Sequence, residues 1–224
     1  MIWFIFIGLT LLSWLASRNV QRKFKQYSTI PTTYGQTGRQ VAEQMLADFD
    51  IRDVTVQMVR GTLTDHYNPT NKTLNLSPEV YNGTNVAAAA VAAHECGHAV
   101  QHATAYRWLT MRSLLVPAVN FSNHIVSWVL LIGILLVQRF PGILLAGIVL
   151  FAVTTLFTFI TLPVEINASR RALAWMDGHN ITSPESHRYA TDALRAAAMT
   201  YVMAALTSLA TLMYYVVVYL SGRD

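Results

Sequence analysis

Apolar and polar stretches alternate along this chain of 224 residues, and several apolar runs are long. Runs over 114–137, 143–162 and about 199–220 each reach the length that crosses a bilayer. The predicted segments, in order, are an N-terminal transmembrane anchor (1–17), a polar region (18–113), a transmembrane hairpin (114–162), a second polar region (163–198) and a C-terminal transmembrane helix with its tail (199–224). The pattern predicts a mainly α membrane protein with about four transmembrane helices.

Basic residues predict which side of the membrane the polar regions occupy. A cleaved signal peptide carries its positive charge before the apolar run, whereas here four Lys and Arg residues follow the run, between positions 18 and 25. Residues 1–17 are therefore predicted to be an uncleaved anchor. Of the 16 Lys and Arg residues, 10 fall in 17–113 and 4 in 163–198, so the positive-inside rule places both polar regions in the cytoplasm.

The first polar region is predicted to form a small α+β unit. Apolar side chains at helical spacing predict an amphipathic helix over 36–49. Apolar and polar residues then alternate over 54–58, 61–67 and 73–77, with turn-forming residues before the last stretch. We expect a small antiparallel sheet, followed by an alanine-rich helix within 84–106.

Composition agrees with a membrane protein and argues against two other classes. Charged residues make up 12% of the chain, against about 25% in soluble domains. Cys96 is the single cysteine, so no internal disulfide can form, and it is predicted to be a small apolar filler. The net charge of +4 comes from basic residues beside the membrane, without a basic stripe interleaved with aromatics, which argues against nucleic-acid binding.

The alanine-rich helix carries the candidate chemistry in the sequence His94-Glu95-Cys96-Gly97-His98. Histidines four residues apart lie on one helix face, where two imidazoles can hold one zinc ion. Glu95 is one position round the helix and is placed to accept a proton from water, as in the HExxH motif of metallopeptidases. The alternative is a surface helix that happens to carry two histidines.

Glu165 is the expected third ligand, because a catalytic zinc ion takes three protein ligands and leaves one position open. The transmembrane hairpin brings the chain back to the same face, and Pro163 is predicted to begin a new helix segment with Glu165 in its first turn. The alternative is a carboxylate favoured there by the helix dipole alone. His102 would lie about 12 Å along the axis from His94, too far to share the ion, so we expect it to support a ligand, line the substrate groove or be structural.

Four stretches of the chain, taken together, resemble a known family. They are Leu63-Thr-Asp-His-Tyr-Asn-Pro, Leu74-Asn-Leu-Ser, Ala92-Ala-His-Glu-Cys-Gly-His-Ala-Val-Gln and Leu162-Pro-Val-Glu-Ile-Asn-Ala-Ser-Arg-Arg-Ala. In this order they resemble the YugP-like neutral zinc metallopeptidases of bacterial membranes, which are gluzincins distantly similar to HtpX-type and CAAX-processing membrane proteases. The resemblance implies a zincin-like catalytic region with Zn²⁺ held by His94, His98 and Glu165, and with Glu95 as the catalytic base.

The resemblance also implies how substrate and ligands are held. The region 63–77 looks like the counterpart of the edge strand that holds the substrate backbone in distant relatives. Those relatives carry an Asp four residues after the ligand Glu, where it orients a metal-binding histidine, whereas this chain has Ser169 there. The sequence therefore leaves open which residue orients the histidines.

We expect a multi-pass protein of the bacterial inner membrane that hydrolyses peptide bonds at the cytoplasmic surface. The expected partners are the lipid bilayer and a peptide or membrane-protein substrate, including misfolded proteins; no nucleic acid is expected, and the sequence leaves the oligomeric state open. A cationic or hydroxyl donor should stabilise the oxyanion. The candidates are His66, Tyr67, Tyr106, His179, His187, Arg188 and Arg195.

Two alternatives compete with this hypothesis. The first is an intramembrane protease with zinc inside the bilayer, which the apolar residues before His94 allow, although a polar, strand-forming segment precedes them. The second is a membrane scaffold that holds a structural zinc without turnover. A saturated site of four protein ligands would favour the scaffold, and an open site would favour catalysis.

Overall fold

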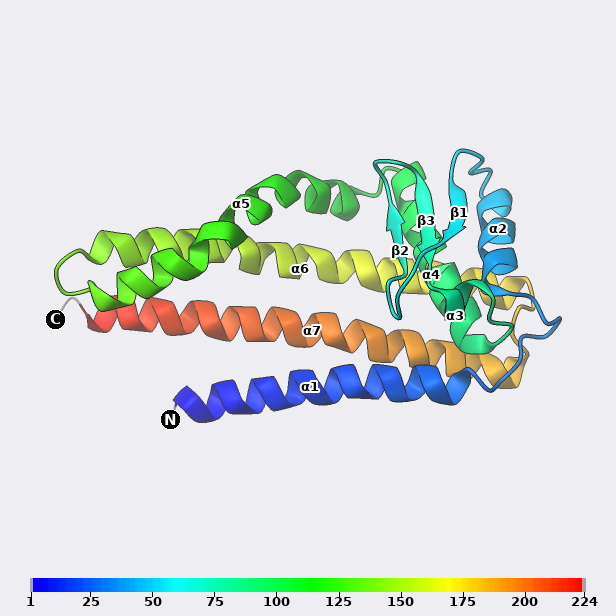
Figure 1. Cartoon of the computed structure of the whole chain (residues 1–224), viewed down its shortest axis with the longest axis horizontal. Helices are drawn as coiled ribbons and strands as arrows, with labels where there is room; N and C mark the ends of the chain where they lie inside the picture. The colour runs from blue at the N-terminus through cyan, green and yellow to red at the C-terminus, as the bar shows by residue number, and fades with distance from the viewer. Residues whose placement is uncertain (1, 223–224) are drawn as a thin grey trace.

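The protein, seen here in a computed structural model that describes residues 2–222, is a set of long helices with a small α+β unit at one end (Figure 1). Its elements are α1 (Ile2–Tyr27), α2 (Gly38–Asp48), β1 (Thr55–Met58), β2 (His66–Asn68), β3 (Thr73–Leu76), α3 (Pro78–Tyr81), α4 (Val86–Ala103), α5 (Arg107–Leu135), α6 (Pro141–Gly178) and α7 (Pro184–Ser221). Met1 of the predicted anchor and residues 223–224 of the predicted tail lie outside the described residues.

The long helices lie side by side in the order α1, α7, α6 and α5 (Figure 1). The two runs predicted to form a hairpin correspond to parts of α5 and α6, although α5 ends two residues before the first run does; the helices pack against each other and are joined by a short turn. α1 begins and α7 ends at the end of the molecule opposite the sheet. The two polar regions therefore meet at the same end, as the distribution of basic residues predicts.

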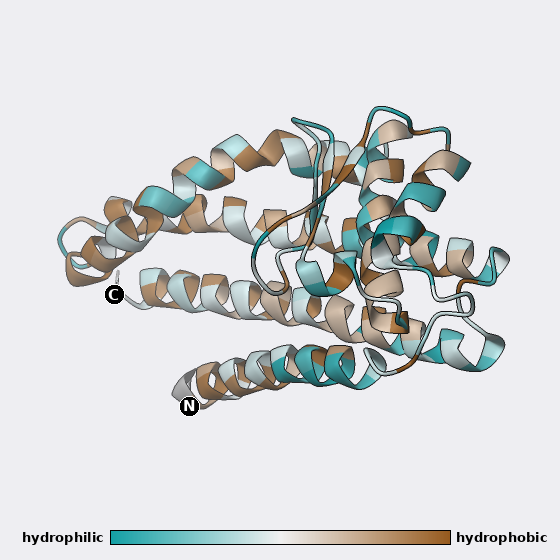
Figure 2. Ribbon diagram, turned by 45° about the vertical axis from the view of Figure 1, so that its right-hand side comes forward, coloured by the Kyte–Doolittle hydropathy of each residue, from teal (hydrophilic) through white to brown (hydrophobic). Residues whose placement is uncertain are grey.

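Three helices among the described residues are long and apolar enough to cross a membrane: α5, α6 and α7. α1 is not one of them, so the anchor predicted over 1–17 and the count of four spans stay predictions. The hydropathy colouring of α1 changes along its length, from hydrophobic in the first half to hydrophilic in the second (Figure 2). The second half packs near the α+β unit, where Lys23 and Tyr27 both donate to the carboxylate of Asp192 on α7.

The small sheet is mixed, so the prediction of an antiparallel sheet is wrong in part. The hairpin of β2 and β3 is antiparallel, but β1 pairs with β3 in parallel, and the strand order is β1-β3-β2. β3 is the central strand, where Leu74 and Leu76 are fully buried, and β1 and β2 are the edge strands. The strand predicted over 61–67 also begins late, because Gly61 and Leu63 have positive φ values of 116° and 58°, which interrupt the extended backbone.

α6 is one continuous helix, so the prediction that Pro163 begins a new segment is wrong. The helix runs through Pro163 from Pro141 to Gly178. An internal proline removes one backbone hydrogen bond, and neighbouring groups in a packed apolar helix can compensate. Glu165 therefore lies deep inside a long rigid helix, and the position of that helix places its carboxylate.

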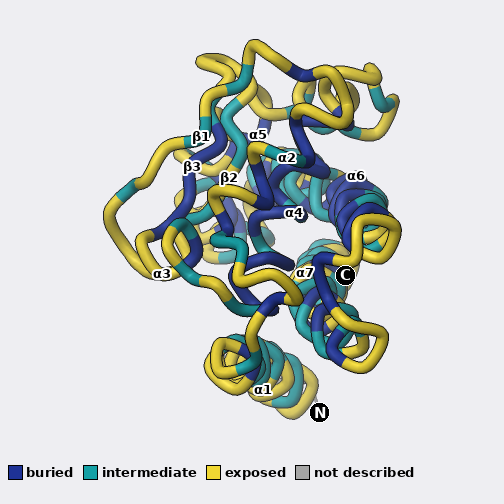
Figure 3. Tube along the Cα trace, turned by 90° about the vertical axis from the view of Figure 1, so that its right-hand side faces the viewer, coloured by how far each residue is buried: buried dark blue, intermediate teal, exposed yellow. Residues whose placement is uncertain are grey.

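α4 forms the centre of the α+β end, between α2 on one side and α6 and α7 on the other (Figure 3). Its alanines are almost all fully buried, since small side chains allow neighbouring helices to approach from several directions. Asn85 caps its first turn by accepting from the backbone N–H of Ala88, and Thr37 and Gln40 form a capping box on α2. The helices predicted over 36–49 and within 84–106 are thus confirmed.

Candidate metal centre

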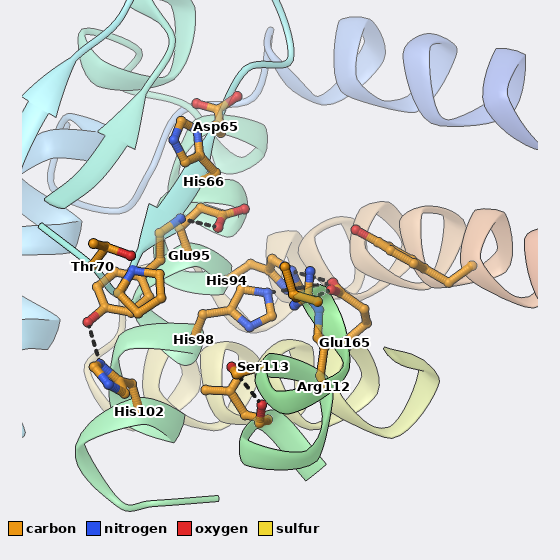
Figure 4. Close-up of a pocket in the computed structure, with 15 residues that line it drawn as sticks. Asp65, His66, Thr70, His94, Glu95, His98, His102, Arg112, Ser113 and Glu165 are labelled. Atoms are coloured by element: carbon orange, nitrogen blue, oxygen red, sulfur yellow. Dashed lines mark hydrogen bonds and ion pairs between the residues drawn. The ribbon is translucent and has the colours of Figure 1, made fainter. Parts of the chain in front are cut away.

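Two helices bring three candidate metal ligands together. His94 and His98 lie one turn apart on α4, and Glu165 on α6 faces both of them (Figure 4). Glu165 Oε2 is 3.3 Å from His94 Nε2 and 3.6 Å from His98 Nε2. Within the described chain, one ligand atom from each of these residues lies within 4.8 Å of the others. Residues separated by more than 60 positions in the sequence thus converge on one point.

Close contact between the backbones of α4 and α6 makes this convergence possible. A Cβ atom at Gly97 would lie 2.7 Å from the carbonyl oxygen of Ala168 and 3.0 Å from its Cα. A side chain of any size at position 97 would therefore force the helices apart. Gly97 lies between the ligands of α4, and Ala168 lies three residues after Glu165, so this contact sets the distance between the ligands.

The donor set fits a zinc ion. Two imidazole nitrogens and one carboxylate oxygen are ligands that zinc prefers. Among residues 2–222, Glu165 Oε2 is a buried oxygen without a hydrogen-bond partner, although the two Nε2 atoms are close. An unpaired buried carboxylate oxygen is costly, and a cation between it and the imidazoles would satisfy all three groups.

The remaining nitrogen of each imidazole is also held. His94 Nδ1 lies 3.1 Å from Ser169 Oγ, and His98 Nδ1 lies 3.1 Å from Gln101 Oε1. The amide of the fully buried Gln101 donates to the backbone carbonyl of Val164, at 2.8 Å, which ties α4 to α6 beside Glu165. With Nδ1–H donating to these oxygens, both rings present Nε2 to the metal position. Ser169 is thus the candidate for the orienting residue that the sequence left open.

The electrostatics of His98 also favour a positive charge at this point. Burial lowers the pKa of the imidazole, but the carboxylates of Glu165 and Glu95 outweigh that effect and raise the pKa of His98 overall. The two negative groups around a buried imidazole therefore attract a cation or a proton. Zinc supplies such a charge with neutral histidine ligands.

Glu95 points away from the ligand cluster toward β2 (Figure 4). Its Oε2 accepts from the backbone N–H of Tyr67 at 3.1 Å, and the residue is only 9% exposed. Tyr67 belongs to β2, an edge strand of the sheet, and its N–H points away from β3 toward the helix. The sheet thus fixes the direction of the carboxylate that the sequence identifies as the catalytic base.

A cavity of about 510 Å³ opens beside these groups. Its walls come from β2 and the residues on either side of it, from α4, from the first turns of α5, and from α6 and α7. His102 lines it and is outside the ligand cluster; its Nδ1 lies 2.8 Å from the hydroxyl of Tyr67.

Two cavity residues were missed in the sequence. Arg112 on α5 has Nη1 3.6 Å from Glu165 Oε1, and Tyr201 on α7 lines the cavity beside His94 and Glu95. Arg112 stands two residues before a predicted span and Tyr201 just inside another, where each looks like an ordinary membrane-interface residue. Gln101 was also missed, although its spacing three residues after His98 is a usable signal.

Of the seven oxyanion candidates taken from the sequence, only His66 and Tyr67 line the cavity. Two of the others are held elsewhere: His179 stacks on Trp175 with Nε2 3.0 Å from Asp48 Oδ2, and Arg188 lies over the ring of Tyr189. Tyr106, His187 and Arg195 do not border the cavity either. Sequence separation alone cannot tell which polar groups a helix bundle brings to one site.

Cys96, which is inside the HExxH sequence, faces away from the metal position. It is fully buried, and its thiol donates to the carbonyl oxygen of Ala42 on α2 at 3.5 Å. Burial raises the pKa of the thiol well above its ordinary value. A neutral, enclosed thiol packs as a small apolar group, which confirms the prediction for Cys96.

Comparison with known proteins agrees with this geometry. A family model described as "Putative neutral zinc metallopeptidase" matches residues 2–220. The "Putative membrane protease YugP" of Bacillus subtilis (strain 168) is 40% identical over 224 residues, which cover 98% of this chain and 99% of that protein. No solved structure matches this chain significantly. The chain therefore belongs to the neutral zinc metallopeptidase family.

Proposed function

We propose that this protein is a zinc-dependent endopeptidase of the membrane surface, with His94, His98 and Glu165 as metal ligands and Glu95 as catalytic base. The observation that carries the proposal is the set of three ligand atoms within 4.8 Å of one another beside a cavity that Glu95 also borders. Three protein ligands beside open space are typical of catalytic zinc, whereas a structural zinc is usually enclosed by four. This arrangement favours an enzyme over a scaffold.

The residues around the cavity have different roles in the proposed peptide hydrolysis. His94, His98 and Glu165 would hold the zinc ion, and the bound ion would supply Lewis-acid chemistry for a carbonyl and for water. Glu95 accepts the proton of the attacking water and delivers it to the leaving amine, and the backbone N–H of Tyr67 holds the carboxylate in place for both transfers. β2 is an edge strand beside the cavity, but the Tyr67 N–H on its outer side is taken by Glu95 and is not free for the backbone of a substrate.

Arg112 and Tyr201 are the donors we propose for the oxyanion. Both line the cavity from helices opposite α4, so the scissile carbonyl would lie between them and the ligand cluster. Charged or hydroxyl donors aimed at a developing oxyanion typically change kcat by about 10²–10³. The sequence candidates His66 and Tyr67 line the other side of the cavity, with β2.

The length of α6 supports a site at the membrane surface. A helix rises 1.5 Å per residue, so Glu165 lies about 36 Å along α6 from Pro141, and the hydrocarbon core is about 30 Å thick. If α6 enters the bilayer near Pro141, Glu165 emerges just beyond the opposite face. The excess of basic residues in the two polar regions supports the proposal that this face is the cytoplasmic one. The name of the B. subtilis relative, a membrane protease, agrees with substrates in or beside the bilayer.

The proposal is tested with Glu95→Gln, which preserves the size of the side chain and removes the base. We expect the purified, zinc-loaded variant to cleave an unfolded protein about 10²–10⁴-fold more slowly than the wild type. Glu185→Gln, an exposed glutamate at the start of α7, is the matched control and should retain the wild-type rate. A Glu95→Gln variant that binds zinc and cleaves at the wild-type rate would overturn the mechanism.

Cysteine-accessibility labelling tests the depth of the site. Single cysteines at Thr70 and Ser113, two exposed residues that line the cavity, are introduced in a background without Cys96 and compared with markers inside α5 and α6 for modification by a membrane-impermeant thiol reagent in intact membranes. Reactivity that appears only when lipid is removed would indicate the intramembrane alternative.

A further inference from the structure

A second, smaller cavity opens on the same reacting groups from the opposite side. It lies between α1, α4 and α7 and has a volume of about 160 Å³. Asp65, His94, Glu95 and Tyr201 border both this cavity and the larger one beside the metal ligands. A substrate that crosses His94 and Glu95 therefore has space on both sides of them.

The lining of the small cavity is apolar apart from the shared rim. Its inner walls include Val20 and Phe24 from α1, Val91 from α4 and Ala197 from α7. An apolar cavity of about 150 Å³ holds one benzene ring and excludes water. The space therefore suits one side chain of the size of leucine, methionine or phenylalanine, and beyond the Asp65 and Glu95 carboxylates at its rim it has no charged group to pair with a charged side chain.

Small residues of α7 keep the space open. Ala193 and Ala197 are one turn apart, so both face the cavity from the same side of the helix. Larger side chains at either position would project into the cavity. Leu63 closes the outer wall from a loop in which its backbone has the unfavourable φ of 58°, and its side chain is 49% exposed. Backbone strain of this kind is common in segments that contact ligands.

We propose that this cavity, which we name the apolar pocket, receives the aliphatic or phenyl side chain of the substrate residue next to the scissile bond, and that Ala193 and Ala197 set the upper limit of its size. The inference rests on the proposed peptidase function and adds its specificity. A bond cleaved by Glu95 must lie over the shared rim, and one extended residue spans only about 3.3 Å. The side chain that enters the pocket therefore belongs to a residue that flanks the cleaved bond.

The first test measures specificity in the full-length, zinc-loaded protein. Blocked fluorogenic peptides differ only in having Ala, Leu, Phe or Trp on either side of the cleaved bond. An apolar pocket distinguishes side chains that differ by a few methylenes by about 10–200-fold in kcat/KM. We expect the wild type to prefer Leu or Phe over Ala by at least about tenfold at one of the two positions, and to reject Trp.

The decisive comparison uses variants of α7. Ala197→Leu should reverse the preference at that position toward Ala, measured as the ratio of kcat/KM for the Leu and Ala peptides. Ala204→Leu is the matched control, because Ala204 is exposed on the same helix and does not line the apolar pocket; it should keep the wild-type preference. If Ala197→Leu does not fold, Ala193→Val provides the smaller change in the same wall. An unchanged preference in a folded pocket variant would overturn the proposal.

A binding experiment provides a readout that does not depend on turnover. Glu95→Gln is incubated with a peptide that carries a diazirine analogue of leucine beside the scissile position, and the cross-linked residue is located by mass spectrometry. We expect cross-links to α1 or to α7 around Val20 and Ala197, and their loss in Ala197→Leu. Cross-links confined to other surfaces, or removed by added phospholipid but not by excess unlabelled peptide, would overturn the proposal and favour a lipid-binding cavity.

These results separate the two hypotheses. If the wild type and Glu95→Gln cleave equally, the proposed function fails whatever the peptides show. If only Glu95→Gln is inactive and Ala197→Leu retains the wild-type preference, the peptidase stands and the apolar pocket does not accept the substrate. Reversal of the preference together with cross-links inside the pocket supports both.

Discussion

Gly97→Ala tests whether the contact between α4 and α6 sets the metal geometry. The new methyl group would lie 2.7 Å from the Ala168 carbonyl oxygen and 3.0 Å from its Cα. Both contacts are to backbone, which cannot rotate away as a side chain can. Restoring ordinary contact requires the helices to separate by roughly 0.5–1 Å. Metal–ligand distances tolerate only about 0.2 Å, so the displaced Glu165 can no longer complete the site with His94 and His98.

The expected effect on stability is smaller than the effect on zinc binding. Alanine in place of glycine favours a helix by about 1 kcal/mol, whereas overpacking a tight contact costs about 1–3 kcal/mol. The free energy of unfolding without metal should therefore change by no more than about 2 kcal/mol. Zinc affinity should fall at least about tenfold, the size of effect seen when ligands lose their orientation.

Zinc affinity is measured by competition with a chromogenic chelator, and thermal unfolding of the metal-free protein reports stability. Gly142→Ala is the control, because no atom lies within 4 Å of the added Cβ at that position of α6. It should leave zinc affinity unchanged. If folded Gly97→Ala binds zinc as tightly as the wild type, close helix contact does not set the ligand geometry and the reasoning is wrong.

Three further predictions concern the groups around the site and the junction of α1 with α7. Ser169→Ala removes the oxygen beside His94 Nδ1, so zinc affinity by chelator competition should fall about tenfold and recover in Ser169→Asp; equal affinity in the alanine variant would exclude an orienting role. Gln101→Leu leaves buried polar groups on α4 and α6 without a hydrogen-bond partner, so the free energy of unfolding of the metal-free protein should fall by about 1–3 kcal/mol in chemical denaturation. An unchanged denaturation midpoint would mean that these hydrogen bonds do not contribute to stability. Burial and the Asp192 carboxylate raise the pKa of Tyr27 from 10.0 to about 12. The neutral hydroxyl therefore stabilises the folded protein fully below pH 10, and this contribution is lost as the pH rises to 12. Tyr27→Phe should flatten the decline of the melting temperature over that range, and a decline as steep as that of the wild type would contradict this role.

The chemistry of α4 could be predicted from the sequence because it depends on local spacing. Helical periodicity alone places His94 and His98 on one face, and the alanines around them show where a helix is tightly packed. The prediction that Glu165 returns to this site rested on two apolar runs that would cross the membrane in opposite directions. It placed the residue correctly beside the histidines, although the helix break expected at Pro163 does not occur.

Features that depend on tertiary packing could not be predicted in the same way. Strand order in the sheet follows from the burial of Leu74 and Leu76, which alternation along a single strand does not reveal. Arg112 and Tyr201 reach the cavity because α5 and α7 lie beside α4 and α6, and no spacing in the sequence links them to the HExxH helix. The backbone N–H that holds Glu95 likewise depends on where the sheet edge lies.

Anomalous diffraction at the zinc absorption edge, from crystals of the zinc-loaded protein, locates the metal independently of activity. We expect a single strong peak about 2.0–2.2 Å from His94 Nε2, His98 Nε2 and a carboxylate oxygen of Glu165, with Glu95 outside direct contact. No peak in a metal-replete crystal, or a peak bound by other residues, would contradict the assignment of these three side chains.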